Sequence, residues 1–216
     1  MARPQSKQEK RIEIRPIQSE EVMLTIIGDT RLIVQKFSEK NKRQIAHRQS
    51  QEAKVNEARD PKDPTEFFEA ARHRLSDGRD GFPAGGISAT AVKAYQRHVD
   101  KMGGPTLRGA FYVLPNDEET NLVAIEYEGG ENGGPAIRED AMRNSGRVAD
   151  LRYRPDYGTR WSMTFAVRYR PDIIDLESLV NALNDGGASV GLGEGRPERS
   201  TLGWGRFHVA AEGETR

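Results

Sequence analysis

The chain has 216 residues and no cysteine, and its 33 Lys and Arg residues are balanced by 33 Asp and Glu residues. This length suits one domain, or one domain with a sizeable insertion, and the lack of cysteine excludes disulfides and thiolate metal sites. No apolar run approaches membrane-spanning length, and residues 1–11 lack a signal-peptide core. We therefore expect a cytoplasmic protein without a membrane partner. Because 35% of its residues are hydrophobic and 31% are charged, we also expect extended polar surface, flexible tails or a partner interface.

The distribution of polar residues predicts how the chain is organised. Residues 1–15 are predicted to form a disordered basic arm, and residues 16–212 a single domain. An insertion is expected at about residues 39–80, because residues 38–59 are almost wholly polar. Within this insertion the polar stretch is either a solvated helix or a mobile linker, and the sequence leaves both alternatives open.

The first half of the folded domain predicts one strand followed by helices. Residues 21–28 form a short apolar run with β-branched residues that ends at a glycine, which is typical of a buried strand. Thr30 is expected to cap a short helical segment after that strand. Residues 65–75 predict a second helix, and Ser88 is expected to cap a third helix over residues 89–102.

The middle of the chain predicts two pairs of strands. Residues 109–114 and 122–127 are expected to form a β-hairpin around an acidic turn. Residues 147–154 and 160–170 alternate with period two, and a turn at Asp156-Tyr157-Gly158 lies between them. The last of these strands would place its large apolar residues on one face of a sheet and its arginines on the open face.

An amphipathic helix and a final strand complete the order of elements. The helix is expected over residues 175–183 with a cap at Gly186-Gly187, and the strand over residues 206–210. This order predicts an α+β fold of the ferredoxin-like or RRM type, in which an antiparallel sheet carries helices on one face and the polar insertion extends from it. The final strand is expected in the central region of that sheet.

Two Gly-hydrophobic-Gly triplets precede the final strand and form the most informative motif in the chain. Gly191-Leu192-Gly193 and Gly203-Trp204-Gly205 flank a segment that carries Arg196 and Arg199. Glycines at alternate positions allow tight turns and close approach of another chain, and arginines offer forked donors to phosphate oxygens. A plain glycine-rich hairpin with solvated charges is the alternative reading of such a loop.

The pattern of Gly-Leu-Gly, a basic linker and Gly-Trp-Gly resembles the C-terminal glycine-rich loop of the RAMP proteins, the RNA-binding subunits of CRISPR systems. Residues 81–93, which lead from a strand into a helix that bears Lys93, are similar to another segment of those subunits. The resemblance implies a ferredoxin-like fold and RNA binding. The chain departs from that family in its longer linker between the triplets and in its insertion-rich middle. Its Gly-x-Gly-x-x-Arg-Pro-Glu segment also resembles uncharacterised bacteriophage proteins, which suggests a phage or mobile-element origin.

Arginine is enriched in the last third of the chain. Residues 143–170 carry seven arginines against two aspartates, and every Lys or Arg after Lys101 is an arginine. Bidentate phosphate contact and base stacking favour this bias, but a GC-rich genome produces it equally well. Tyr153 or Trp161 is a candidate stacking platform, although the alternation around Trp161 favours core packing. The predicted nucleic-acid contacts are Arg152, Arg154, Arg160, Arg168, Arg170, Gly191, Gly193, Arg196, Arg199, Gly203, Gly205 and Arg206.

Catalytic motifs are not found in this sequence. His47, His73, His98 and His208 are scattered without metal-ligand spacing, and no P-loop, nucleophile elbow or dinucleotide-binding fingerprint occurs. We therefore expect no catalytic residue, no metal and no cofactor. Some RAMP proteins cut RNA with a histidine base, but here exposed polar histidines are the favoured interpretation.

Three functions remain open from the sequence. The leading hypothesis is a non-catalytic protein that binds single-stranded nucleic acid, RNA in preference to DNA, as a homo-oligomer or as a subunit of a larger complex. The second is a self-assembling structural or interaction protein of a phage. The third is a mimic of a RAMP subunit that inhibits a host defence complex, and it follows only from the resemblance to RAMP proteins together with the suspected phage origin.

Overall fold

The computed structural model describes residues 16–36, 63–98, 102–129, 133–143 and 149–214. The predicted arm over residues 1–15 and the polar stretch over residues 38–59 lie outside the described residues. The helices are α2 (Pro64–Ala71), α3 (Ala84–His98), α4 (Gly104–Ala110) and α5 (Leu176–Ser189). The strands are β1 (Glu20–Gly28), β2 (Gly81–Pro83), β3 (Phe111–Val113), β4 (Leu122–Ala124), β5 (Glu126–Tyr127), β6 (Ala136–Arg143), β7 (Ala149–Asp156), β8 (Trp161–Tyr169) and β9 (Phe207–Val209).

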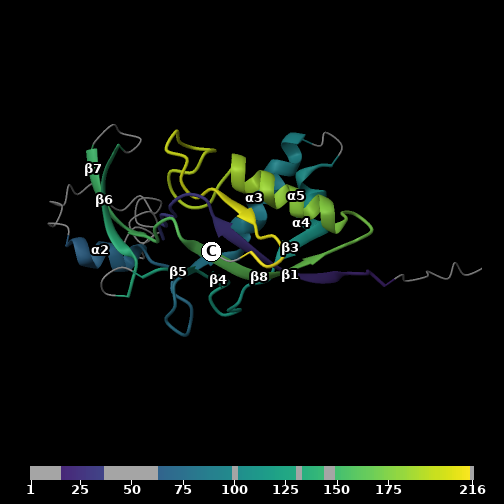
Figure 1. Ribbon diagram of the computed structural model, residues 1–216, viewed down its shortest axis with the longest axis horizontal. Helices are drawn as coiled ribbons and strands as arrows, with labels where there is room; N and C mark the ends of the chain where they lie inside the picture. Colours follow the sequence, from purple (N-terminus) through teal and green to yellow (C-terminus); the bar gives the residue numbers. More distant parts are fainter. Residues whose placement is uncertain (1–15, 37–62, 99–101, 130–132, 144–148, 215–216) are drawn as a thin grey trace, which may run out of the picture.

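A five-stranded antiparallel sheet forms the centre of the fold (Figure 1). Its strands follow the order β3-β8-β1-β9, and β5 also pairs with β8. Along the chain, α3 leads from β1 towards β3, and α5 leads from β8 to β9. This βαββαβ arrangement is ferredoxin-like, so the predicted fold class is confirmed. The final strand, however, lies at the sheet edge beside β1, and its predicted central position is wrong, because β8 already occupies the other side of β1.

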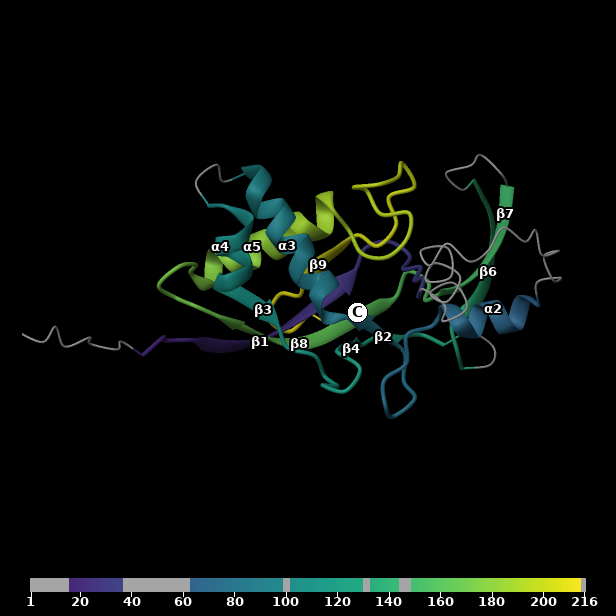
Figure 2. The same ribbon diagram turned by 180° about the vertical axis from the view of Figure 1, so that it is seen from behind.

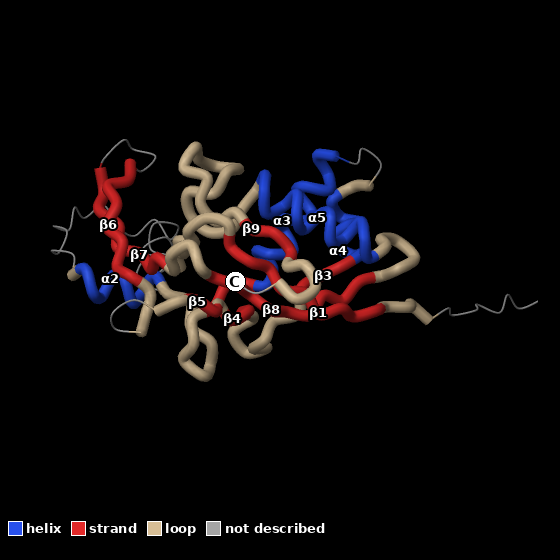
Figure 3. The backbone as a smooth tube through the Cα atoms, viewed as in Figure 1, coloured by secondary structure: helices blue, strands red, loops and turns tan. Residues whose placement is uncertain are grey.

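One face of the sheet is covered by helices α3, α4 and α5 (Figure 3). The period-two pattern of β8 turns Trp161, Met163 and Phe165 into the core beneath these helices, where all three are fully buried. Ile26 of β1 pairs with Met163 and is also fully buried. The core therefore lies between one face of the sheet and the helical layer, as the alternation of β8 predicts.

A second group of elements extends from one end of the sheet, where β6 and β7 form a two-stranded ribbon and α2 packs against β7 (Figure 2). The chain after β1 reaches this group in an extended conformation. The Leu32 N–H donates to the Gly158 carbonyl at 3.0 Å, and the Tyr157 N–H donates to the Leu32 carbonyl at 2.9 Å. The short helix predicted after Thr30 is therefore wrong, because this backbone pairs with the chain that follows β7.

The predicted hairpin of residues 109–114 and 122–127 is also wrong. Most of these residues do form strands, but β3 pairs with β8, β4 pairs with β2 and β5 pairs with β8. Residues 147–154 and 160–170 likewise contain strands, yet β7 pairs with β6 and not with β8. Period-two alternation identifies strands but carries no information about their partners.

Two predicted helix ends differ from the structure. Ser88 lies inside α3, where its hydroxyl accepts from the Val113 N–H at 3.0 Å and so ties the helix to β3. Gly186 and Gly187 lie inside α5 instead of ending it. A Cβ at Gly186 would lie 3.0 Å from the Thr90 backbone of α3, so the two helices cross at this point without a side chain between them.

We predict that Gly187→Ala destabilises the protein, because the added Cβ would lie 1.9 Å from the carbonyl oxygen of Phe207 in β9. The free energy of unfolding, measured by chemical denaturation, should fall by about 1–3 kcal/mol. Gly85→Ala is the matched control, since Gly85 is also helical but its added Cβ meets nothing within 4 Å. The control should be neutral or slightly stabilising, and equal effects of the two substitutions would contradict the packing at Gly187.

Candidate nucleic-acid interface

The glycine-rich loop, residues 190–206, connects α5 with β9 and lies beside the helical layer (Figure 1). Its glycines adopt the left-handed conformation that other residues rarely adopt, with φ between +65° and +73°. They are Gly191, Gly193, Gly195, Gly203 and Gly205. Both triplets therefore carry glycine because any other residue would be strained in this backbone conformation.

The two triplets pack against each other and against the chain that follows β1. The Leu192 N–H donates to the Gly205 carbonyl at 2.9 Å, and the Gly205 N–H donates to the Arg31 carbonyl at 2.8 Å. The Glu194 N–H donates to the Ile33 carbonyl at 2.8 Å. These amides are consequently occupied within the protein, and they do not form the open cradle expected for an approaching nucleic acid.

Four cations converge on Glu198, which lies in the glycine-rich loop between the two triplets. Lys93 and Arg97 extend from α3, whereas Arg196 and Arg199 belong to the loop. The Lys93 Nζ lies 2.9 Å from the Glu198 carboxylate, and the nitrogens of Arg196, Arg97 and Arg199 lie at 3.3, 3.7 and 3.9 Å respectively. We call these five residues the Glu198 cluster. With four cations and one carboxylate, it carries an excess of three positive charges.

The carboxylate of the Glu198 cluster is less exposed than the cations around it. Its side chain is 14% exposed, whereas that of Arg199 is 71% exposed. Burial alone would raise the pKa of Glu198, but its hydrogen bonds and charge interactions with Lys93 and Arg196 outweigh burial and lower that pKa. Glu198 is therefore ionised at neutral pH, and the cations surround it on the solvent side.

Arg154 contributes to a different site, at the base of the β6–β7 ribbon. Its side chain is 0% exposed, and its guanidinium lies 2.5 Å from Asp140 and 3.4 Å from Glu194 of the glycine-rich loop. A phosphate cannot reach a guanidinium that is enclosed in this way, so we remove Arg154 from the predicted contacts. Arg154 instead joins the ribbon to the loop by a buried ion pair.

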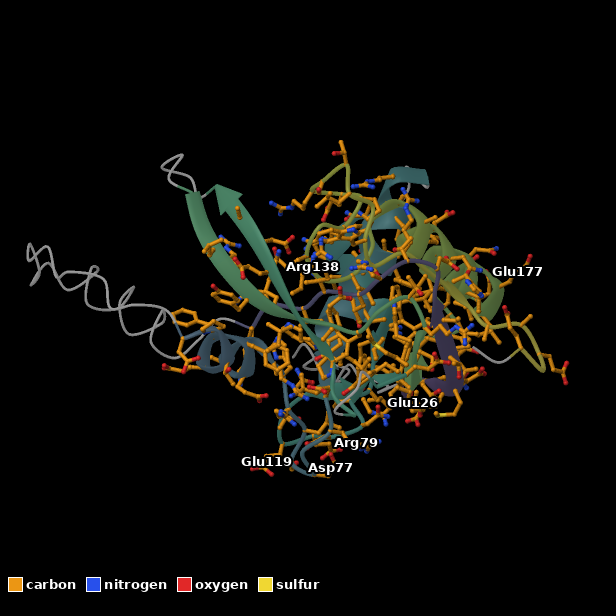
Figure 4. All side chains as sticks on the ribbon, turned by 60° about the vertical axis from the view of Figure 1, so that its left-hand side comes forward. Asp77, Arg79, Glu119, Glu126, Arg138 and Glu177 are labelled. Atoms are coloured by element: carbon orange, nitrogen blue, oxygen red, sulfur yellow. The ribbon has the colours of Figure 1, made fainter. Side chains whose placement is uncertain are left out.

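Arg138, which is labelled in Figure 4, belongs to β6. Its contact with Trp204 is a second link between the ribbon and the loop. The guanidinium carbon of Arg138 lies 4.5 Å from the centre of the Trp204 ring. A Cβ at Gly195 would lie 2.3 Å from that ring, so Trp204 is held between the backbone of Gly195 and Arg138. This cation–π stack fixes the second Gly-hydrophobic-Gly triplet against β6.

The arginines of β8 and its neighbours are distributed over the surface and do not converge. Arg160 lies 3.0 Å from Glu128, and Arg170 lies 2.6 Å from Asp172. Arg168 lies on the open sheet face, where its guanidinium pairs with Glu21 and donates to the Tyr112 hydroxyl at 2.9 Å. Each of these cations therefore already has one carboxylate partner, unlike the four that share Glu198.

The remaining predicted residues lie at two further positions. Arg152 is a half-buried residue of β7. Arg206 donates from its guanidinium to the Ala188 carbonyl at 2.5 Å, at the end of α5. Tyr153 is half-buried, whereas Trp161 is fully buried and donates from its indole to the Thr30 carbonyl at 2.8 Å. Trp161 is therefore a core residue and not a stacking platform.

Lys93, Arg97 and Glu198 were not among the residues that the sequence predicted for the site. Lys93 lies in the segment that resembles the RAMP proteins, but no motif in the sequence includes Arg97. Their spacing of four residues on a predicted helix places both on one helix face, which is a usable signal. The sequence does not reveal that this face meets the glycine-rich loop, which lies a hundred residues further along the chain.

A recess of about 650 Å³ lies away from this cluster, beside β5 and the loop that contains Asp77 and Arg79 (Figure 4). Its charged groups neutralise one another, since Arg79 lies 2.8 Å from Asp77 and Arg72 lies 2.6 Å from Asp80. Burial raises the pKa of Tyr127 to about 12, and its hydroxyl donates to Asp80 at 2.7 Å. The recess offers no excess charge, so we take the Glu198 cluster as the candidate interface.

Comparison with known proteins finds a likeness among solved structures but none among families or curated sequences. Neither protein-family models nor curated proteins gave a match to this sequence. Among solved structures, Cmr6 from Pyrococcus furiosus aligns with 10% sequence identity and a TM-score of 0.41. The alignment covers 90% of this chain and 100% of that chain.

The described residues show neither a metal-binding cluster nor a membrane-spanning helix. In that part of the chain, no group of three or more His, Cys, Asp or Glu side chains is arranged to hold a metal ion. None of the helices described above is long and apolar enough to cross a membrane.

We predict that Arg154→Ala destabilises the fold far more than Arg160→Ala does. Loss of the buried guanidinium removes the partner of Glu194 and one of the two cations beside Asp140, which keeps Arg138 at 2.9 Å, so the free energy of unfolding should fall by about 1–3 kcal/mol. Arg160 is 70% exposed, and its loss should cost less than about 1 kcal/mol. Chemical denaturation of the two variants compares these values. An Arg154→Ala protein as stable as Arg160→Ala would contradict the buried ion pair.

Proposed function

We propose that this protein binds single-stranded nucleic acid without catalysis, and that the Glu198 cluster contacts the phosphate backbone. The observation that carries the proposal is the excess of three positive charges where α3 meets the glycine-rich loop. Electrostatic contact with phosphates supplies most of the sequence-independent affinity for nucleic acids. A local excess of cations therefore matters more for such binding than the net charge of zero of the whole chain.

The chemistry of the cluster suits phosphate oxygens. Arg97 and Arg199 are 46% and 71% exposed, and their guanidinium groups offer several donors in a planar fork. Each lies more than 3.5 Å from Glu198, so neither is fully committed to that carboxylate. Arg196 lies closer and also donates to the Gly193 carbonyl at 3.0 Å, which holds it in place.

Five further arginines extend the proposed contact along a strand in smaller roles, because most of them are already paired within the protein. They are Arg152, Arg160, Arg168, Arg170 and Arg206. The preference for RNA over DNA and the phage or mobile-element origin rest on the resemblances of the glycine-rich loop. We also propose that the protein is located in the cytoplasm.

We predict that the double variant Arg196→Ala/Arg199→Ala weakens binding to labelled oligouridine and oligothymidine alike. Loss of two cationic contacts should reduce affinity about tenfold or more and make its dependence on salt concentration shallower by about 1.4 units, at about 0.7 per contact on a single strand. Fluorescence anisotropy over a salt series measures both quantities. The matched control is Arg74→Ala/Arg79→Ala, which removes two exposed arginines outside the cluster and should have a much smaller effect. Affinity and salt dependence that survive loss of Arg196 and Arg199 would refute the site.

Self-assembly is the second candidate function, and the open face of the sheet favours it. Met23 of β1 is 62% exposed and Tyr112 of β3 is 45% exposed on that face, which no helix covers among the described residues. Exposed apolar side chains of this size are suited to contacts between subunits. A homo-oligomer and a nucleic-acid complex are compatible, since copies of a binding protein can assemble along one strand.

Size-exclusion chromatography with absorbance at two wavelengths separates the two functions. We expect purified protein to elute as a large species rich in nucleic acid, and RNase treatment to reduce its size. An oligomer that contains no nucleic acid and resists both RNase and DNase would favour self-assembly alone. Met23→Ser should then shift that oligomer towards monomer, because it removes the most exposed apolar side chain of the face.

A further inference from the structure

The carboxylate of Glu198 is already surrounded like a bound anion. Lys93 Nζ lies 2.9 Å from both of its oxygens, so the ammonium group bridges them. Arg97 approaches Oε1, while Arg196 and Arg199 approach Oε2. The cations therefore converge on one point occupied by one anionic group, and they are not arranged in a row.

This convergence limits what the cluster can accept. Carboxylates and phosphates use the same charge-assisted donors, so a phosphate that approaches Lys93 and Arg196 meets nitrogens that already point towards Glu198. The incoming group must either displace the carboxylate or bind next to a like charge, and both reduce affinity. Four cations around a single point also fit one phosphate group better than a tract of successive phosphates.

We propose that Glu198 is a built-in competitor that occupies a one-phosphate site and that a phosphate of the bound strand displaces it. This inference rests on the proposed function and concerns the same cluster. Glu198 keeps the four cations together when no strand is bound, and its charge lowers the affinity of the cluster for any polyanion. Removal of that charge should consequently strengthen binding.

The test compares variants of the full chain by anisotropy with fluorescently labelled oligouridine over a salt series. Glu198→Gln keeps the shape of the side chain and an acceptor for Lys93 but removes the charge. We expect its affinity to rise about three- to tenfold, as removal of a like charge from beside a phosphate predicts. Glu198→Ser removes the same charge with a smaller side chain and should also bind more tightly. Glu198→Asp keeps the charge and should stay within about twofold of the unchanged protein.

Glu177→Gln is the matched control for net charge. Glu177 is exposed in the first turn of α5 (Figure 4). The Glu198 cluster lies beyond the other end of that helix, where the Glu198 N–H donates to the Val190 carbonyl at 3.3 Å. A 14-residue helix is about 20 Å long, so a charge change at Glu177 should leave binding nearly unchanged. An equal gain for Glu177→Gln and Glu198→Gln would overturn the inference, because the effect would then come from net charge alone.

The remaining outcomes separate this inference from the proposed function. If the unchanged protein binds through Arg196 and Arg199 but Glu198→Gln and Glu198→Ser bind no better, the competitor role is wrong and the proposed function stands. If neither the unchanged protein nor any Glu198 variant binds the oligonucleotide, the proposed function itself fails. Thermal melting checks folding. Loss of folding in both neutral variants, with Glu198→Asp intact, would show that the charge is needed for the fold and would also overturn the competitor role.

Discussion

The backbones of Leu192 and Gly205 approach so closely that no side chain fits between them, and the glycine-rich loop takes its shape from this contact. A Cβ at Gly205 would lie 1.9 Å from the Leu192 carbonyl oxygen, and one at Gly193 would lie 2.2 Å from the Ile33 carbonyl oxygen. These approaches anchor both ends of the loop to the fold. The segment between the ends is thereby held against α3, where Glu198 meets Lys93.

The distribution of charge explains why a neutral protein can still present a basic site. Several arginines outside the Glu198 cluster are paired one to one with carboxylates, as Arg160 is with Glu128 and Arg170 is with Asp172. Such pairs cancel locally and contribute little to a field at longer range. Where several cations share Glu198, cancellation is incomplete, and the excess charge is confined to one part of the surface.

Local patterns were sufficient to predict β1, β8 and the start of α5, because burial of one face imposes a period that the sequence displays. The sequence did not predict which strands pair with each other, since pairing is decided by contacts between distant segments. Residues 109–114 and 122–127 show this limit, because each contains a strand but the two do not pair with each other. At the site, Arg196 and Arg199 were predicted from their place between the glycine triplets. Their neighbours on α3 were missed for the same reason as the strand partners.

The role of the glycines changes once the loop is seen in place. A loop rich in glycine and arginine suggests that backbone amides bind the ligand. Here, however, the amides of Leu192, Glu194 and Gly205 donate to carbonyl groups of the protein itself. The contribution of the glycines is therefore geometric, because their left-handed conformations direct the chain so that Glu198 meets Lys93 and Arg97 of α3. Any anion that binds this segment must therefore be held by the charged side chains, and the negative charge of Glu198 among them must lower the affinity.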